Sequence, residues 1–174
     1  NYELAFPVLA RYGLKATIFT VTGLAGQTQG DLTYLSWPEM AAMERSGVIE
    51  LQAHTHDGHY KVGNVPALQS WPRTQVAADL AQLRQGFAEA GLRAPTAYAY
   101  PFGAFSQDTI AELQARGVRL GFTVEHGYVQ QGADPMRLPR LIIYPATSAC
   151  RFAELVSGNS HCNPDISSSL YVDY

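Results

Sequence analysis

The stretch 48-VIELQAHT-55 decides the fold of this chain, because it has the pattern of a buried strand that ends in polar residues. Its apolar residues Ile49, Leu51 and Ala53 alternate with polar ones, so they share one face of the strand while His54 lies on the other. Similar strand-like stretches alternate with helix-like stretches along the chain, which predicts βα units and a parallel sheet. This α/β pattern fits an open doubly wound sheet and a closed barrel equally well.

The expected helices begin at recognisable capping residues. Ser36 can cap the helix that Trp37-Pro38 opens, and Glu39 can complete a capping box. A second Ser-Trp-Pro, at 70–72, predicts the start of the longest helix. The apolar stripe of that helix consists of Val76, Leu80, Leu83 and Phe87. We expect strands at 14–23, 48–55, 96–102, 119–125 and 138–145, and helices at 4–12, 36–46, 70–90, 107–116 and 148–156.

The composition indicates one globular domain. The chain has 174 residues, of which 47% are hydrophobic and 16% charged, with a formal charge of -3. That charge, without a basic cluster, argues against nucleic-acid binding. No apolar run is long enough to span a bilayer, and no signal peptide is visible. We expect a domain over 1–156 and a polar extension over 157–174, in which Cys162 could pair with Cys150 or stay a thiol.

Three histidines crowd the stretch 53-AHTHDGHY-60, directly after the strand. The carboxyl ends of parallel strands are where active sites gather, and a turn at Asp57-Gly58 can swing His59 back toward His54. Two neutral imidazoles are good ligands for Zn²⁺ or a similar divalent ion. Either a polar surface loop or a metal site fits, and a metal site could use His54 with His59 or His54 with His56. The second pairing is a His-x-His arrangement, which also occurs in amidohydrolase barrels.

Four stretches in order give the chain a family resemblance: 6-FPVLARYGLKATIF-19, 50-ELQAHTHDGH-59, 98-YAYPFGAFS-106 and 138-LPRLII-143. With them the chain resembles the polysaccharide deacetylases of the NodB-homology (carbohydrate esterase 4) type, and most of all the branch that de-N-acetylates poly-β-1,6-N-acetylglucosamine in biofilm matrix. The resemblance covers about residues 1–156 and implies a distorted, incomplete, TIM-like (β/α) barrel that lacks its first strand.

The resemblance assigns the histidines. In this branch the pattern His-[Ser/Thr]-x-x-x-His makes His54 and His59 the metal ligands, and Thr55 the hydroxyl residue that shapes the loop. His56 falls on a variable position. The resemblance implies a divalent metal, zinc first, with cobalt or nickel as alternatives.

The stretch 100-YPFG-103 matches the third motif of the family. The resemblance implies that the backbone N–H of Phe102 helps to stabilise the tetrahedral oxyanion, and that Pro101 helps to fix the turn. Tyr100 is assigned to the same catalytic group and also to substrate binding, together with Trp71.

Several family features are missing from this chain. The first motif, Thr-Phe-Asp-Asp-Gly, supplies a general base and a third metal ligand, but no Asp-Asp pair occurs in the sequence. Ala99 stands where many members carry Arg, and 141-LIIYPA-146 lacks the histidine that serves as general acid in many members. His126 and His161 match no motif, and we interpret them as surface residues. We therefore expect a truncated chain that binds metal weakly and is impaired in catalysis.

The function implied is metal-dependent hydrolysis of the acetamide groups of an N-acetylglucosamine polysaccharide, which yields acetate and free amine, outside the cytoplasm. One rival is a different metal amidohydrolase that uses His54 and His56. Another is a non-catalytic carbohydrate-binding domain of the same fold. Its candidate aromatic residues are Trp71, Tyr98, Tyr100 and Phe105, although we favour core or rim packing for Tyr98 and Phe105.

Overall fold

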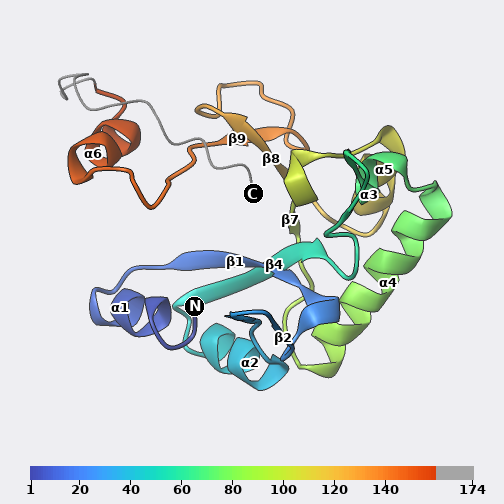
Figure 1. Ribbon diagram of the computed structural model, residues 1–174, viewed down its shortest axis with the longest axis horizontal. Helices are drawn as coiled ribbons and strands as arrows, with labels where there is room; N and C mark the ends of the chain where they lie inside the picture. Colours follow the sequence, from blue (N-terminus) through green and yellow to red (C-terminus); the bar gives the residue numbers. More distant parts are fainter. Residues whose placement is uncertain (160–174) are drawn as a thin grey trace. The chain divides into compact units, whose positions relative to one another are not determined.

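The computed structural model of the chain describes residues 1–159 (Figure 1). These residues divide into two compact units, one of Asn1–Arg140 and one that begins at Leu141. The first unit contains all five strands of the main sheet and every predicted site residue. The second contains α6 (Ala149–Ser157), which Ser148 caps by accepting a hydrogen bond from the Arg151 N–H. The predicted boundary at residues 156 and 157 stays a prediction.

The main sheet confirms the predicted α/β class. Its strands run in the order β1-β4-β7-β8-β9, and each pairs in parallel with the next. Because the spatial order equals the chain order, no switch point of a doubly wound sheet occurs, and the arrangement is that of a barrel wall. The strands are β1 (Ala16–Val21), β4 (Ile49–Thr55), β7 (Ala97–Ala99), β8 (Leu120–His126) and β9 (Leu138–Arg140).

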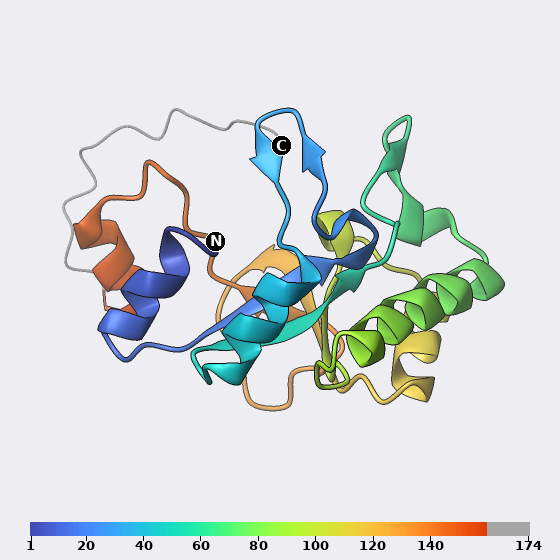
Figure 2. The same cartoon turned by 90° about the horizontal axis from the view of Figure 1, so that it is seen from below.

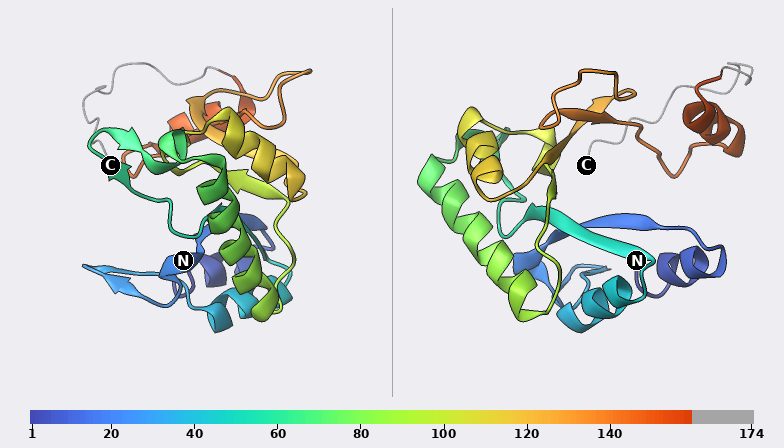
Figure 3. Two further views of the ribbon diagram at one scale, coloured as in Figure 1. Left: turned by 90° about the vertical axis from the view of Figure 1, so that its right-hand side faces the viewer. Right: turned by 180° about the vertical axis from the view of Figure 1, so that it is seen from behind.

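Three helices of the first unit, α2, α4 and α5, cover the outer side of the curved sheet (Figures 1 and 3). Both α2 and α4 pack against β4, and α5 packs against α4. Their buried side chains form one core with the sheet, and Leu83, Phe87 and Leu113 are almost completely buried. The helices of the first unit are α1 (Ala5–Arg11), α2 (Trp37–Arg45), α3 (Ala67–Ser70), α4 (Arg73–Glu89) and α5 (Gln107–Ala115).

The predicted caps explain one of these helices and misplace the start of another. Ser36 and Glu39 form the expected capping box of α2. The second Ser-Trp-Pro does not work in the same way, because Ser70 is the last residue of the short helix α3 and its hydroxyl donates to the Ala67 carbonyl. The longest helix, α4, begins only after Pro72. The last predicted strand is also shorter than expected, since β9 ends at Arg140.

A buried glutamine reinforces the sheet where its ladder is shortest. Only one residue pair, Ala53 with Tyr98, joins β4 to β7. The side-chain oxygen of Gln52 accepts hydrogen bonds from the backbone N–H groups of Thr96 (2.9 Å) and Ala97 (2.8 Å). This side chain replaces missing ladder bonds, so β7 keeps its place beside β4.

Two short hairpins leave the carboxyl edge of the sheet. One, β2 (Thr28–Gln29) with β3 (Leu32–Thr33), follows β1 through the 3₁₀ turn η1 (Thr22–Leu24). The other, β5 (Lys61–Val62) with β6 (Val65–Pro66), follows β4. Figure 2 shows that both project to the same side of the first unit. The sequence did not predict either hairpin.

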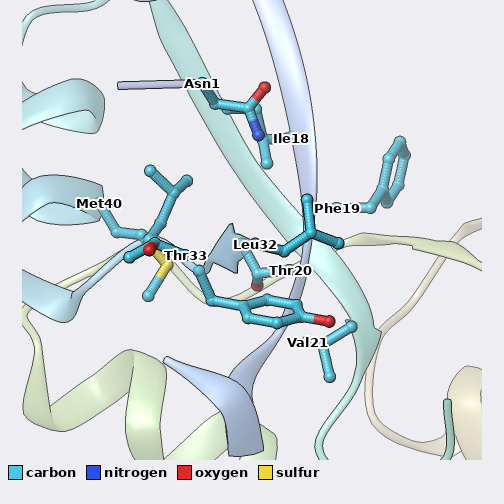
Figure 4. Close-up of a pocket in the computed structure, with 10 residues that line it drawn as sticks. Asn1, Ile18, Phe19, Thr20, Val21, Leu32, Thr33 and Met40 are labelled. Carbon is cyan, nitrogen blue, oxygen red and sulfur yellow. The ribbon is translucent and has the colours of Figure 1, made fainter. Parts of the chain in front are cut away.

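A cavity of about 280 Å³ lies between β1, β3 and α2 (Figure 4). Its walls are mostly apolar, and none of the histidines lines it. The candidate chemistry therefore lies elsewhere, at the carboxyl ends of the strands. The lining includes Ile18, Thr20, Val21, Leu32, Tyr34 and Met40.

Candidate active site

Three neighbouring strands place the candidate residues at one edge of the sheet. His54 is the penultimate residue of β4, and His56 and His59 lie in the loop that follows. The turn η1 comes after β1, and the 3₁₀ turn η2 (Pro101–Gly103) comes shortly after β7. Because the strands are parallel, these three loops meet at the carboxyl edge, as the sequence pattern predicts.

His54 is oriented by the strand beside it. Its Nδ1 lies 2.6 Å from the carbonyl oxygen of Ala99 on β7. A carbonyl can only accept, so Nδ1 carries the proton and Nε2 keeps a free lone pair. Burial lowers the pKa of His54 to about 4, and the Ala99 carbonyl opposes this shift only in part. The imidazole is therefore neutral at neutral pH, the form that binds a metal ion.

The ring of His59 lies close to the ring of His54. The two ring centroids are 5.1 Å apart, with 44° between the ring planes. The other neighbour of His59 is Phe102, whose ring stacks on it at 4.6 Å and 29°. Burial lowers the pKa of His59, which also favours the neutral imidazole. The structure thus brings together the two histidines that the family pattern pairs.

The turn between these histidines is built on Thr55 and Gly58. The Gly58 N–H donates to the Thr55 hydroxyl at 2.8 Å, and this hydrogen bond closes a tight turn over residues 55–58. A side chain at Gly58 would meet a methyl group of Leu68 at 2.4 Å and the Thr55 hydroxyl at 2.7 Å, so only glycine fits without rearrangement. The expected turn at Asp57-Gly58 is present, and it directs His59 toward His54.

His56 has different neighbours. Its Nδ1 lies 3.0 Å from the hydroxyl of Thr22 in η1, and its carbonyl accepts the Gly23 N–H at 2.9 Å. The ring is therefore held on the β1 side of the loop, whereas His54 is held by β7. This arrangement favours the pairing of His54 with His59 over the His-x-His alternative.

Phe102 has an unusual backbone conformation. Its φ of 56° and ψ of 14° put it in the left-handed region, where it is the only residue other than glycine with a positive φ in the described chain. Its backbone N–H makes no hydrogen bond to any residue of that part of the chain. Lys61 lies over its ring, with Nζ 4.8 Å from the centroid. Pro101 is buried and opens the turn, and its carbonyl accepts the Ala104 N–H at 3.0 Å.

Tyr100 does not lie where substrate binding needs it. Its side chain is completely buried, and its hydroxyl donates to the Met136 carbonyl at 2.9 Å. Burial also raises the pKa of this phenol. We correct the expectation accordingly: the side chain of Tyr100 supports the core below η2, because an interior phenol that already has a partner cannot reach a polysaccharide. Any catalytic contribution has to pass through its backbone.

The other aromatic candidates divide between the core and the rim. Tyr98 is buried, as the core interpretation expected. Phe105 is half-buried between the ring of Tyr100 at 4.6 Å and the guanidinium of Arg137 at 5.2 Å. Trp71 is half-buried, and its indole N–H donates to the Tyr60 hydroxyl at 3.3 Å. Of the two predicted substrate-binding residues, Trp71 and Tyr100, only Trp71 therefore has a partly exposed side chain.

Two residues near the site were missed by sequence reasoning. Arg140, at the end of β9, donates to the Thr123 carbonyl at 2.7 Å, and its positive charge contributes to the lowered pKa of His54. Asp79, on α4, binds the loop that contains His56 and Asp57. A signal for Asp79 was present, because a carboxylate there interrupts the predicted apolar stripe of the helix. Arg140 lies within a quoted family stretch, but nothing in the pattern indicated its position.

The described residues can contribute two nitrogen ligands to a metal ion. His54 and His59 have the neutral imidazoles that zinc prefers. Within residues 1–159, no group of three or more His, Cys, Asp or Glu side chains could hold a metal by itself. The donor set therefore fits zinc as part of a site. His126 is exposed on β8, as predicted, whereas His161 and Cys162 lie outside the described residues, and so do both alternatives for Cys162, a bond to Cys150 or a thiol.

Comparison with known proteins identifies the family. Residues 1–121 match the sequence model of the polysaccharide deacetylases. The chain belongs to the polysaccharide deacetylase family. The resemblance found in the motifs is thereby confirmed. In the part of the chain that the structure describes, no helix is both long enough and apolar enough to cross a membrane.

Relatives of this deacetylase chain include two staphylococcal enzymes. It is 31% identical to the poly-β-1,6-N-acetyl-D-glucosamine N-deacetylase of Staphylococcus epidermidis over 144 residues, which is 82% of this chain and 50% of the relative. It is 28% identical to the protein of the same name from Staphylococcus aureus MRSA252, with the same coverage. The chain thus spans about half the length of the curated relatives it matches.

Solved structures confirm the fold. IcaB from Ammonifex degensii superimposes with a TM-score of 0.76 at 26% identity, over 84% of this chain and 64% of that protein. The Streptococcus pyogenes deacetylase PplD gives a TM-score of 0.75 at 23% identity, over 88% of this chain and 64% of that protein. The parallel five-stranded sheet is therefore the distorted barrel wall of this deacetylase family.

Proposed function

We propose that this chain carries the metal-binding histidines and the oxyanion-binding turn of an N-deacetylase that acts on a poly-β-1,6-N-acetylglucosamine-like polysaccharide outside the cytoplasm. The names of the staphylococcal relatives support the substrate class. The observation that carries the proposal is the hydrogen bond between His54 Nδ1 and the Ala99 carbonyl at 2.6 Å, because it leaves Nε2 free in a ring whose centroid lies 5.1 Å from that of His59. Zinc is the metal proposed first, with cobalt and nickel as alternatives.

The two imidazoles would hold the ion, which supplies a Lewis acid and an activated water when bound. Hydrolysis of the acetamide places negative charge on the carbonyl oxygen in the transition state. The unpaired N–H of Phe102 is a preformed donor for that charge, and it lies on a turn that stacks against His59. Pro101 is buried in the same turn, which limits movement of this donor.

Within residues 1–159, no third His, Cys, Asp or Glu side chain joins His54 and His59 in a group that could hold a metal ion. We therefore expect the 174-residue chain alone to bind metal weakly. The full-length gene product is the proper material for tests of activity. In it, acetate and free amines should appear together from poly-β-1,6-N-acetylglucosamine, a chelator should abolish both, and added Zn²⁺ should restore them.

The second candidate function is glycan binding without catalysis. Half-buried Trp71, with Tyr60 exposed beside it, favours this reading, because flat rings can cover the apolar faces of sugars. The two functions differ in one result. Binding of the polysaccharide by the full-length protein, with no release of acetate at any metal concentration, would support the binding domain and exclude the enzyme.

A further inference from the structure

We propose that Asp79 on α4 is a positioning residue that holds the loop between the two metal-binding histidines and so sets the relation of the two imidazoles. The inference rests on the proposed function, since it concerns the same metal site. It concerns a residue outside the histidine loop, twenty positions after His59 along the chain.

The Asp79 carboxylate accepts three hydrogen bonds from this loop. Oδ2 accepts from the Thr55 hydroxyl and from the His56 N–H, both at 2.9 Å, and Oδ1 accepts from the Asp57 N–H at 2.7 Å. The residue is only 7% exposed. A buried carboxylate without partners is strongly unfavourable, so these three donors account for its presence in the interior.

Thr55 extends the reach of Asp79 to the other end of the turn. Its hydroxyl donates to Asp79 and accepts the Gly58 N–H at 2.8 Å. Three successive backbone N–H groups, those of residues 56, 57 and 58, are therefore bound by two side chains. His54 precedes this bound segment and His59 follows it, so its shape determines where the second imidazole lies.

The anchor itself is rigid. Asp79 lies between Val76 and Leu80 on the buried face of α4, and both neighbours belong to the hydrophobic core. A helix packed along that face cannot shift without disturbing the core. Both Asp79 oxygens are occupied by loop donors, so this carboxylate orients the site and is not one of its ligands.

The test compares Asp79→Asn with wild type in the full-length protein. The amide keeps the size of the carboxylate but presents an NH₂ group to donors, so at least one loop bond is lost. We expect the Kd for Zn²⁺, measured by competition with a chromogenic chelator, to rise about ten- to a hundredfold. In the metal-free protein, amide hydrogen exchange at residues 56–58 should accelerate relative to the rest of the core.

Glu112→Gln is the matched control, because Glu112 is also a buried carboxylate that accepts from Arg73 and Arg116, but on α5 and outside this loop. It should leave the Kd for Zn²⁺ and the exchange at 56–58 unchanged. A Kd for Asp79→Asn within twofold of wild type would overturn the inference. So would equal losses of zinc affinity in Asp79→Asn and Glu112→Gln.

Thr55→Val keeps the proposal testable if Asp79→Asn does not fold. Valine preserves the shape but removes the link to Gly58, so exchange of the Gly58 amide should accelerate and zinc affinity should fall several-fold. Unchanged values in this variant would contradict the proposal. If the wild-type protein binds no Zn²⁺, the proposed function fails, and amide exchange at residues 56–58 alone decides the role of Asp79.

Discussion

The ring of His59 stacks on the ring of Phe102, with the centroids 4.6 Å apart. One of these residues is a candidate ligand and the other supplies a free backbone N–H, so a single contact joins the two halves of the proposed site. Phe102 makes this contact from a backbone with a positive φ of 56°.

This conformation predicts different outcomes for two substitutions of the same residue. Both Phe102→Ala and Phe102→Gly remove the ring, but glycine adopts a φ of 56° without steric cost. Phe102→Gly should therefore be more stable than Phe102→Ala by about 1 kcal/mol in urea denaturation. Equal stabilities would show that the turn relaxes out of the left-handed region. Both variants should bind Zn²⁺ more weakly than wild type, because His59 loses its support.

The lowered pKa of His54 predicts a pH-dependent stability of the metal-free protein. The unfolded imidazole titrates near the ordinary histidine pKa of 6.5 and the folded one has a pKa of about 4, so the unfolded state binds more protons between these values. Stability is therefore full above pH 6.5 and falls as the pH decreases toward 4. The loss has an upper bound of about 3 kcal/mol.

Urea denaturation at several pH values tests this dependence. His54→Gln should flatten the slope between pH 4 and 6.5, although His59 retains a smaller contribution of the same sign. His126→Gln, which removes an exposed imidazole at the end of β8, is the control. A slope that His54→Gln does not reduce would contradict the assignment of the effect to burial of this ring.

The close approach of Gly23 to the histidine loop predicts that a larger residue at this position destabilises the protein. An added methyl group at this position would lie 2.5 Å from the carbonyl oxygen of His56, which is backbone and cannot swing away. Gly23→Ala should destabilise the protein by about 1–3 kcal/mol. Gly127→Ala is the control, since its methyl group would meet nothing closer than Pro139 at 3.7 Å. Similar stabilities of the two variants would argue against a tight contact.

The hydrogen bonds of Gln52 to β7 and the residue before it predict that replacing this side chain lowers the stability of the protein. Gln52→Leu would leave the N–H groups of Thr96 and Ala97 without their acceptor in a buried place. Each unsatisfied group costs about 1–3 kcal/mol, so thermal unfolding should occur well below the wild-type temperature. A near-neutral effect would mean that water or the backbone replaces the lost acceptor.

The sequence predicted the parts of the fold that periodicity and capping determine. The strand over 48–55 was predicted within one residue of its observed start at Ile49, because alternation over seven residues is a strong signal. The cap at Ser36 was also predicted correctly, since its hydroxyl accepts a first-turn N–H of α2, and the structure shows Ser106 capping α5 in the same way. Ser70 misled the prediction because the chain forms a separate short helix before Pro72.

Other features depend on tertiary contacts and left little trace in the sequence. Each of the two hairpins has strands of only two residues, too short to show alternation. The positive φ of Phe102 could not be predicted, because phenylalanine rarely adopts it and the surrounding packing imposes it. The burial of Tyr100 depends on Met136, which lies far along the chain. Asp79, in contrast, was visible as a charge within an apolar stripe.

The zinc affinities of His59→Ala and His56→Ala in the full-length protein test the central claim most directly. If His54 and His59 are the ligands, His59→Ala should raise the Kd for Zn²⁺ at least about a hundredfold, since a ligand is lost outright, whereas His56→Ala should stay within about threefold of wild type. A Kd that rises for His56→Ala and stays unchanged for His59→Ala would contradict the account and favour the His-x-His site.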